Sequence, residues 1–82
     1  MSRRYGEPIA VTLRGEQPIG FTWRGRQYQV QVIGFWRLAT RWWDAEHPAD
    51  RDYYRLMTPD FAVYEVYQEQ TSGAWVLDRC LD

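Results

Sequence analysis

The sequence predicts an all-β protein, a small and strongly bent antiparallel sheet or partly open barrel of five to six strands with one short helical or irregular connection. Apolar and polar residues alternate with a period of two over most of the chain. Short turns rich in glycine and polar residues separate the alternating segments. The 82 residues suffice for one hydrophobic core, so we expect a single domain over residues 1–82.

The first part of the chain is expected to form three strands. Apolar residues alternate over residues 9–13, 19–23 and 28–32. The turns between them, residues 14–17 and 24–27, each contain a glycine. Alternating segments joined by such short turns predict a meander.

The alternation breaks after Gly34, so residues 35–52 are expected to form a connection. This connection is expected to be irregular or to contain a short helical turn around residues 48–51, because proline is tolerated in the first turn of a helix. Alternation then resumes, and the last two of the following strands are expected to pair as a hairpin. These three strands are expected over residues 52–58, 61–69 and 75–81.

Charge and hydropathy favour a cytoplasmic protein that acts away from membranes. No apolar run approaches the ~20 residues of a membrane helix, and the basic N-terminus lacks the apolar segment of a signal peptide. All 10 basic residues are arginine, and they are concentrated in the first half of the chain, whereas the acids are concentrated in the second. We expect the two halves to neutralise each other, because the pI of 5.7 is low for a nucleic-acid module.

The sequence lacks the residue sets that catalysis requires, and we expect a non-enzyme without cofactor or metal. His47 and Cys80 are the single histidine and the single cysteine. His47 is expected in a solvated loop, and Cys80 is expected to be buried and inert. The acidic stretch around His47 lacks the glycine of a metal-binding loop, which favours a solvated turn. Its potential ligands are Asp44, Glu46, His47, Asp50 and Asp52.

Recognition of another macromolecule is the function that the composition favours, because tryptophan and arginine are the residue types that carry contact energy at interfaces. Both cluster in the expected connection, which predicts a surface for a protein partner. The candidate partner-binding residues are Trp36, Arg37, Arg41, Trp42 and Trp43. Whether Trp42 and Trp43 anchor a partner or plug the ends of the barrel is left open by the sequence.

Two alternatives remain. The first is a small barrel that binds single-stranded DNA or RNA, with arginines contacting phosphates and tyrosines stacking on bases. The second is a subunit that dimerises through an exposed edge strand. The candidate nucleic-acid-binding residues are Arg14, Arg24, Arg26, Tyr28, Tyr53 and Tyr54.

Three blocks of the chain resemble the C-terminal region of ImuB, the Y-family-polymerase-like subunit of the bacterial mutasome, over roughly residues 20–82. Residues 34–36 and 41–44, with four residues between them, are similar to its Gly-Pro-Trp and Arg-Trp-Trp-Asp signature, with Phe35 in place of the proline. Residues 51–56 resemble its Arg-Asp-Tyr-Tyr-Arg-Val strand, and residues 64–82 resemble its final hairpin and strand. Small stand-alone bacterial proteins of unknown function share this pattern.

The resemblance implies a role in DNA repair by error-prone translesion synthesis within the SOS response. It implies that the domain docks an error-prone DNA polymerase complex and that the tryptophan-rich segment takes part in docking. No polymerase chemistry is implied for this chain.

Overall fold

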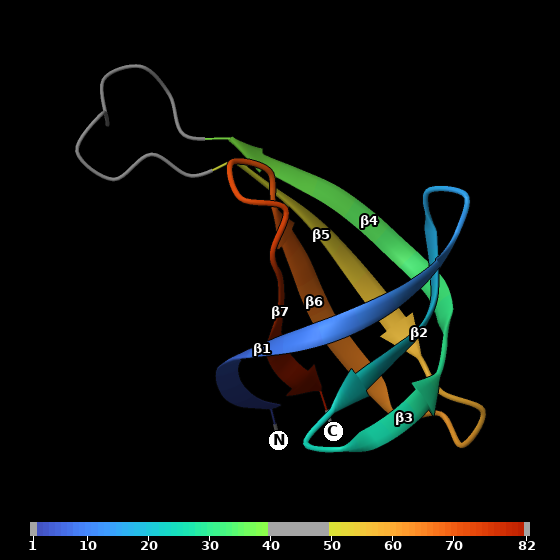
Figure 1. Ribbon diagram of the computed structural model, residues 1–82. Coiled ribbons are helices and arrows are strands. Elements are labelled where there is room, and N and C mark those ends of the chain that lie inside the picture. The colour runs from blue at the N-terminus through green and yellow to red at the C-terminus, as the bar shows by residue number, and fades with distance from the viewer. Residues whose placement is uncertain (1, 40–49, 82) are drawn as a thin grey trace.

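The computed structural model describes residues 2–39 and 50–81, and every regular element within these ranges is a β-strand (Figure 1). The all-β class is thereby confirmed, but the described ranges hold seven strands where five to six were predicted. The strands are β1 (Ser2–Arg14), β2 (Gln17–Trp23), β3 (Arg26–Gln29), β4 (Gln31–Ala39), β5 (Asp50–Met57), β6 (Val63–Glu69) and β7 (Trp75–Leu81). The part of the chain that the structure describes contains no helix, and so none that could cross a membrane.

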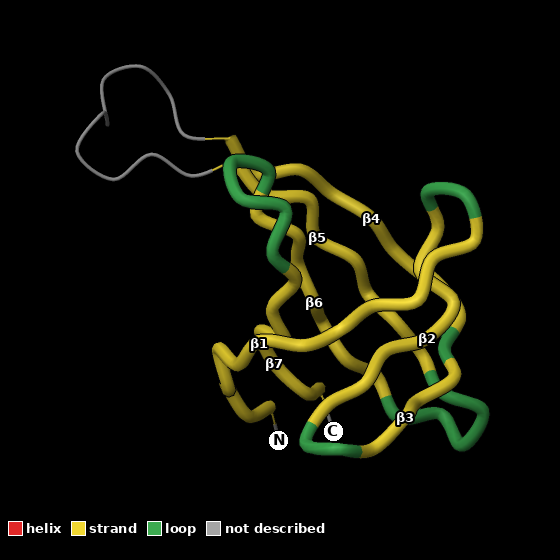
Figure 2. Tube along the Cα trace, viewed as in Figure 1, coloured by secondary structure: helices red, strands yellow, loops and turns green. Residues whose placement is uncertain are grey.

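The seven strands form one antiparallel sheet in the order β3-β2-β1-β7-β6-β5-β4. The sheet curls into a half-barrel, with β1 and β2 crossing in front of β5, β6 and β7 (Figures 1 and 2). This agrees with the strongly bent sheet expected from the sequence.

The third predicted strand is divided at Val30 into β3 and β4. The backbone N–H of Val30 donates to the carbonyl of Ile19 on β2, at 3.0 Å. β3 therefore pairs with β2, whereas β4 pairs with β5 on the other side of the half-barrel. One bent segment thus links the two ends of the sheet.

The predicted connection over residues 35–52 is wrong at both ends, since β4 continues to Ala39 and β5 starts at Asp50. The register between β4 and β5 shifts between Val32 and Gly34, which is a β-bulge. A bulge adds one residue to one strand and so reverses the alternation that follows it. The predicted helical turn is contradicted at residues 50–51, which belong to β5, and its other half lies outside the described residues.

A second irregularity explains why β1 begins at Ser2 rather than at residue 9. The register between β1 and β7 shifts between Arg4 and Glu7, and Gly6 lies there with a φ of +63°. Glycine adopts this left-handed conformation without a steric penalty. Because the register shifts there, apolar and polar residues do not alternate regularly over residues 2–8, and the sequence pattern does not show where β1 begins.

The core lies on the concave side of the sheet, where β2 faces β5, β6 and β7. Aromatic rings link the two halves: Phe21 stacks on Tyr28 at 4.8 Å between centroids and meets Tyr64 edge-on at 5.5 Å. The buried hydrophobic residues are Phe21, Val30, Leu56, Tyr64, Val66 and Leu77.

Candidate interaction surface

The convex face of β4, β5, β6 and β7 carries side chains in rows that run across the strands. Leu56, Val66 and Leu77 point into the core. Successive side chains on a strand point to opposite faces, so residues such as Tyr53 and Tyr67 point outward. The strand register then sets equivalent outward residues side by side. We call this surface the outer face.

The central row of the outer face is aromatic. Trp36 pairs with Tyr53, and Tyr53 pairs with Tyr67 on the next strand. The Trp36 and Tyr53 rings are nearly parallel, with centroids 5.3 Å apart and 5° between their planes. The Tyr53 and Tyr67 centroids are 5.1 Å apart. Trp36 is still 37% exposed, so the row ends in an accessible indole.

One neighbouring row is charged and centred on Glu65. This carboxylate is only 5% exposed, and it accepts hydrogen bonds from Arg55 Nε at 3.0 Å and Nη2 at 2.6 Å. Its other oxygen lies 3.2 Å from Arg79 Nε. A buried charge is costly unless it is paired, and here two guanidinium groups pair with one carboxylate.

The row on the other side is an ion pair between Arg51 and Glu69, with Nε 2.8 Å from Oε2. Hydrogen bonds to Tyr53 and to Glu69 hold the pKa of Arg51 above its ordinary value. Burial raises the pKa of Tyr67, against the opposing effect of Arg51. Both groups therefore keep their usual charge states at neutral pH.

Two of these arginines also lie over rings of the aromatic row. The Arg55 guanidinium carbon lies 5.5 Å from the Trp36 ring centroid, and that of Arg51 lies 4.5 Å from the Tyr67 centroid. Such cation–π contacts favour one orientation of each ring. Trp36 is thus held by stacking on one side and by a cation on another.

The outer face is hollowed beside Trp36. A shallow depression of about 340 Å³ opens between β4, β5, β7 and the N-terminal end of β1. Its lining combines an indole and a phenol with charges of both signs. The lining residues include Trp36, Arg37, Leu38, Tyr53, Glu65 and Arg79.

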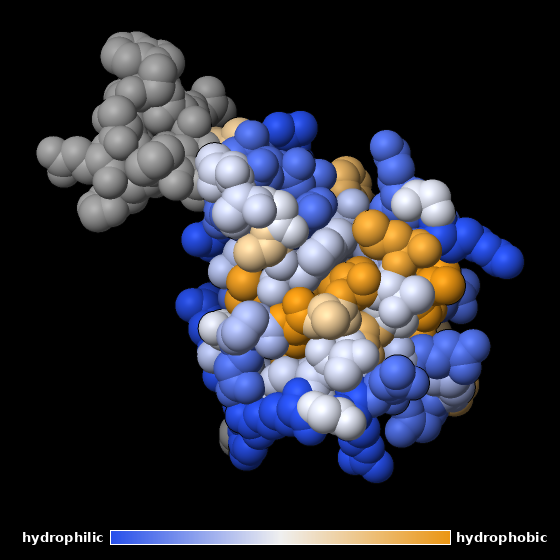
Figure 3. All heavy atoms as spheres, viewed as in Figure 1, coloured by the Kyte–Doolittle hydropathy of each residue, from blue (hydrophilic) through white to orange (hydrophobic). Residues whose placement is uncertain are grey.

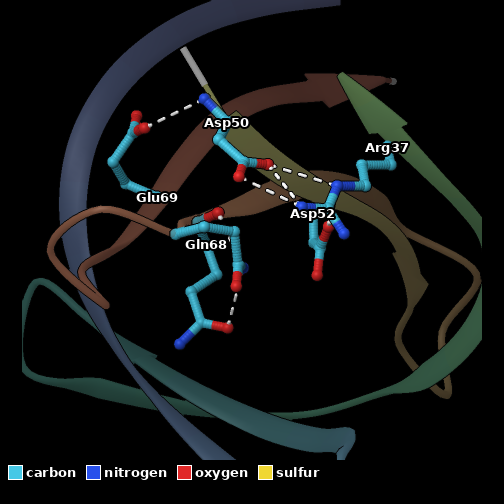
Figure 4. A network of polar contacts seen from close by, with 6 residues as sticks. Arg37, Asp50, Asp52, Gln68 and Glu69 are labelled. Carbon is cyan, nitrogen blue, oxygen red and sulfur yellow. Dashed lines mark hydrogen bonds and ion pairs between the residues drawn. The ribbon is translucent and has the colours of Figure 1, made fainter. Parts of the chain in front are cut away.

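Arg37 lies on the opposite face from Trp36, as expected for adjacent residues of a strand. Its Nη2 donates to both carboxylate oxygens of Asp50, at 2.9 and 3.0 Å, and its Nε lies 3.8 Å from Asp52 (Figure 4). Figure 4 also shows Glu69 accepting a hydrogen bond from the backbone N–H of Asp50, at 3.4 Å. The charge of Arg37 is therefore neutralised within the chain.

Two of the five predicted partner-binding residues lie in the described part of the chain. Their side chains start on opposite faces of β4, but both residues line the depression beside Trp36, so the structure brings these two together. Arg41, Trp42 and Trp43 lie outside the described residues, as do Asp44, Glu46 and His47 of the acidic stretch.

The six residues predicted to bind nucleic acid are distributed over both faces. Arg14 and Arg26 are exposed beside hairpin turns, and Tyr53 belongs to the outer face. Tyr28 packs against the core, and Tyr54 lies on the inner face, where burial raises its pKa. They do not form a continuous stacking platform.

Arg24, the remaining residue of that set, is held in a cluster around Glu7. Arg24 donates to Glu7 from Nη2 at 2.6 Å and from Nε at 3.1 Å, and Trp23 Nε1 donates to it at 2.9 Å. The Arg24 guanidinium also lies over the Trp23 and Tyr5 rings, at 4.6 and 5.4 Å. Hydrogen bonds from Arg24 and then Trp23 hold the pKa of Glu7 below its ordinary value.

The described residues contain no group of three or more potential metal ligands among histidine, cysteine and acidic side chains. Cys80 is half-buried, packs against the core and forms no disulfide.

Sequence reasoning missed the row around Glu65 and the exposed Phe61. The row depends on the pairing of three strands, which local patterns do not give. Phe61 lies in the turn between β5 and β6 with a φ of +68° and is 76% exposed. A bulky residue directly after Pro59 and Asp60 in a turn was the available signal.

Apolar side chains are also exposed on the other side of the molecule. Figure 3 shows hydrophobic atoms in a band over β1 and the β1–β2 hairpin, where Leu13 and Ile19 are exposed, with hydrophilic residues around it.

These features define a small antiparallel half-barrel domain whose convex face combines an aromatic row with paired charges. The chain belongs to the family described as a domain of unknown function, DUF6504, whose model matches residues 1–82. Comparisons with curated proteins and with solved structures gave no match.

Proposed function

We propose that this domain is a non-catalytic protein-interaction module that binds its partner through the outer face around Trp36. The observation that carries the proposal is an indole stacked on Tyr53 and clamped by Arg55, yet more than one third exposed. Tryptophan, tyrosine and arginine are enriched among residues that dominate binding energy. A side chain already held in one orientation loses little entropy when a partner binds.

The charge arrangement favours a protein over a polyanion as the partner. Five of the nine arginines in the described ranges form ion pairs with acids of the same chain, which reduces the positive charge available to attract phosphates. Both signs of charge surround the aromatic row, as is common around protein interfaces. The paired arginines are Arg24, Arg37, Arg51, Arg55 and Arg79.

The proposed partner is an error-prone DNA polymerase complex of cytoplasmic translesion synthesis, for which the domain acts as an accessory. This part of the proposal rests on the resemblance to the ImuB C-terminal region, since the family match does not extend to ImuB. The described parts of the resembling blocks fall on β4, β5, β6 and β7, which are neighbours in the sheet, and they include Trp36, Tyr53 and Tyr67. A docking surface built from these blocks would require them to meet in this way.

Affinity purification from DNA-damaged bacterial cells tests the proposal. The wild-type domain is expected to retain a polymerase complex that Trp36→Ala loses. Phe61→Ala is the matched control, because it removes an exposed aromatic ring that lies in the β5–β6 turn, outside the row of Trp36. Equal retention by wild type and Trp36→Ala, with both folded by circular dichroism, would contradict the proposal.

Single-stranded nucleic acid is the second candidate, favoured by Arg14 and Arg26. Both are exposed, and neither forms an ion pair within the described ranges. Phosphate contacts release counterions, so affinity for single-stranded DNA should fall steeply between two salt concentrations and should weaken in Arg14→Ala and Arg26→Ala. Affinity that is absent or independent of salt would remove this candidate.

A further inference from the structure

The sheet ends at β4, and this edge strand exposes large hydrophobic side chains on both faces. Seven such residues are exposed in the described part of the chain, and four of them belong to β4. They are Ile33 at 46%, Phe35 at 56%, Trp36 at 37% and Leu38 at 48%. No described strand pairs with the outer edge of β4, and Figure 1 shows it at the rim of the sheet.

β4 carries two features that limit pairing of an edge strand, the bulge between Val32 and Gly34 and the inward-facing Arg37, but neither protects residues 34–39 as a whole. It contains no proline or lysine, and its one charged residue, Arg37, is neutralised by Asp50 and Asp52. The opposite end of the sheet provides an internal contrast. β3 is only four residues long and consists of Arg26, two glutamines and a half-buried tyrosine. A short polar edge is protected, whereas the longer and mostly apolar edge of β4 is a template for another strand.

The composition of β4 favours a second copy of the same strand as that partner. With Arg37 neutralised, β4 offers no free charge that would select an oppositely charged segment. Pairing of β4 with itself around a two-fold axis brings the same apolar side chains together from both sides. An isologous contact of this kind also closes after two chains and so does not propagate into a fibre.

The register of such a pair follows from the bulge and from Arg37. The bulge between Val32 and Gly34 limits the regular part of the strand to residues 34–39. In an antiparallel two-fold pair, one residue lies opposite its own copy. Within residues 34–39, the largest number of residues is paired when the two-fold axis passes through Trp36 or through Arg37. Centring on Arg37 sets two guanidinium groups opposite each other, and although each is paired with Asp50, centring on the uncharged Trp36 avoids the repulsion between them.

We infer that two copies of this protein associate by antiparallel pairing of their β4 strands, centred on Trp36. In this register Leu38 lies opposite Gly34 of the second copy, which has no side chain to obstruct it. Phe35 lies opposite Arg37 of the second copy. The aromatic rows join into one row running through Tyr67, Tyr53 and Trp36 of each chain. This goes beyond the proposed function, since the dimer would present two copies of the partner-binding surface, joined at the two-fold axis.

Cysteine cross-linking tests the register in a Cys80→Ser background, which removes the only native thiol. Opposed Cα atoms lie about 4.5–5.5 Å apart, within disulfide range, whereas positions displaced by two residues lie about 7–8 Å apart, outside it. An equimolar mixture of Phe35→Cys and Arg37→Cys should form a disulfide dimer on mild oxidation, and neither variant should do so alone. Phe61→Cys controls for random collision.

Cross-linking of either variant alone at the rate of the mixture, or no cross-linking above the Phe61→Cys control, would overturn the inference.

Sedimentation over about 5–500 μM supplies a measurement free of new cysteines. The wild-type protein should show a concentration-dependent dimer, weakened at least tenfold by Leu38→Lys and unchanged by Phe61→Lys. A wild-type monomer throughout, or equal dimerisation by Leu38→Lys, would overturn it. Retention of the polymerase complex by a monomeric protein would leave the proposed function intact.

Discussion

The indole of Trp36 lies parallel to the phenol ring of Tyr53, with 5.3 Å between centroids and 5° between planes. The two residues are 17 positions apart in sequence and meet because β4 pairs with β5 in this register. Stacking on a neighbouring strand explains how a large apolar ring stays ordered while it remains accessible. The proposed role of Trp36 in partner binding depends on the ring being both ordered and exposed.

Glu65 is expected to be the most sensitive charged residue of the outer face. Glu65→Gln leaves Arg55 and Arg79 without their shared carboxylate, so we expect the free energy of unfolding to fall by about 1–3 kcal/mol. Urea denaturation measures the change. Glu16→Gln, at an exposed turn, is the control and should change stability by less than about 0.5 kcal/mol. Equal effects of the two substitutions would contradict the assignment of a buried, doubly paired carboxylate.

Gly20 and Gly34 offer a matched pair of substitutions. A Cβ at Gly20 would lie 2.9 Å from the Tyr28 carbonyl oxygen, a backbone atom, whereas at Gly34 the nearest atom is Arg55 Cβ at 3.4 Å. We therefore expect Gly20→Ala to destabilise the fold by about 1–3 kcal/mol, because β2 and β3 would have to separate. Gly34→Ala should change stability by less than about 1 kcal/mol. Thermal denaturation of both variants checks the order, and the reverse order would contradict the β2–β3 packing.

Phe61 is expected to reduce the stability of the fold. Its φ of +68° is unfavourable for a bulky side chain, and its 76% exposure gives little burial in return. Asparagine tolerates this conformation, so Phe61→Asn should raise the free energy of unfolding by roughly 0.5–1 kcal/mol. Phe61→Ala keeps a Cβ and should give a smaller gain. A loss of stability in Phe61→Asn would mean that the ring makes a stabilising contact.

The Glu7 cluster predicts a specific dependence of stability on pH. Its pKa is lowered from the ordinary value of 4.5, chiefly by the Arg24 hydrogen bond and then by that of Trp23. A carboxyl whose pKa is depressed in the folded state contributes stability above the unfolded pKa and loses it as pH falls through the folded pKa. We expect the difference in Tm between wild type and Glu7→Gln to be largest at neutral pH and to shrink below about pH 4.5. A difference that is constant from pH 7 to the acid limit would contradict the cluster.

Local patterns were sufficient to predict the hairpins and the class of fold. The β1–β2 and β2–β3 turns combine glycine with alternating flanks, and Arg24 and Gly25 both have positive φ between the paired residues Trp23 and Arg26, as a two-residue hairpin requires. These signals act within a few residues, so they can be read from the sequence.

The strands that present the outer face were harder to predict, because the deciding contacts are not local. The bulge near Gly34 reversed the alternation of β4 and made a strand resemble a connection. The composition singled out Trp36 as a binding residue. It could not reveal that Asp50 and Asp52 neutralise Arg37, or that Arg55, Glu65 and Arg79 line up across three strands, since both depend on strand register.

Titration of a purified error-prone DNA polymerase complex against the wild-type domain and Trp36→Ala measures whether the exposed indole contributes to binding. We expect removal of the indole to weaken binding at least tenfold, while Phe61→Ala binds like the wild type. Thermal denaturation confirms in parallel that all three proteins are folded. Equal affinity of folded Trp36→Ala and wild type, or no binding by any of the three, would contradict the proposed function.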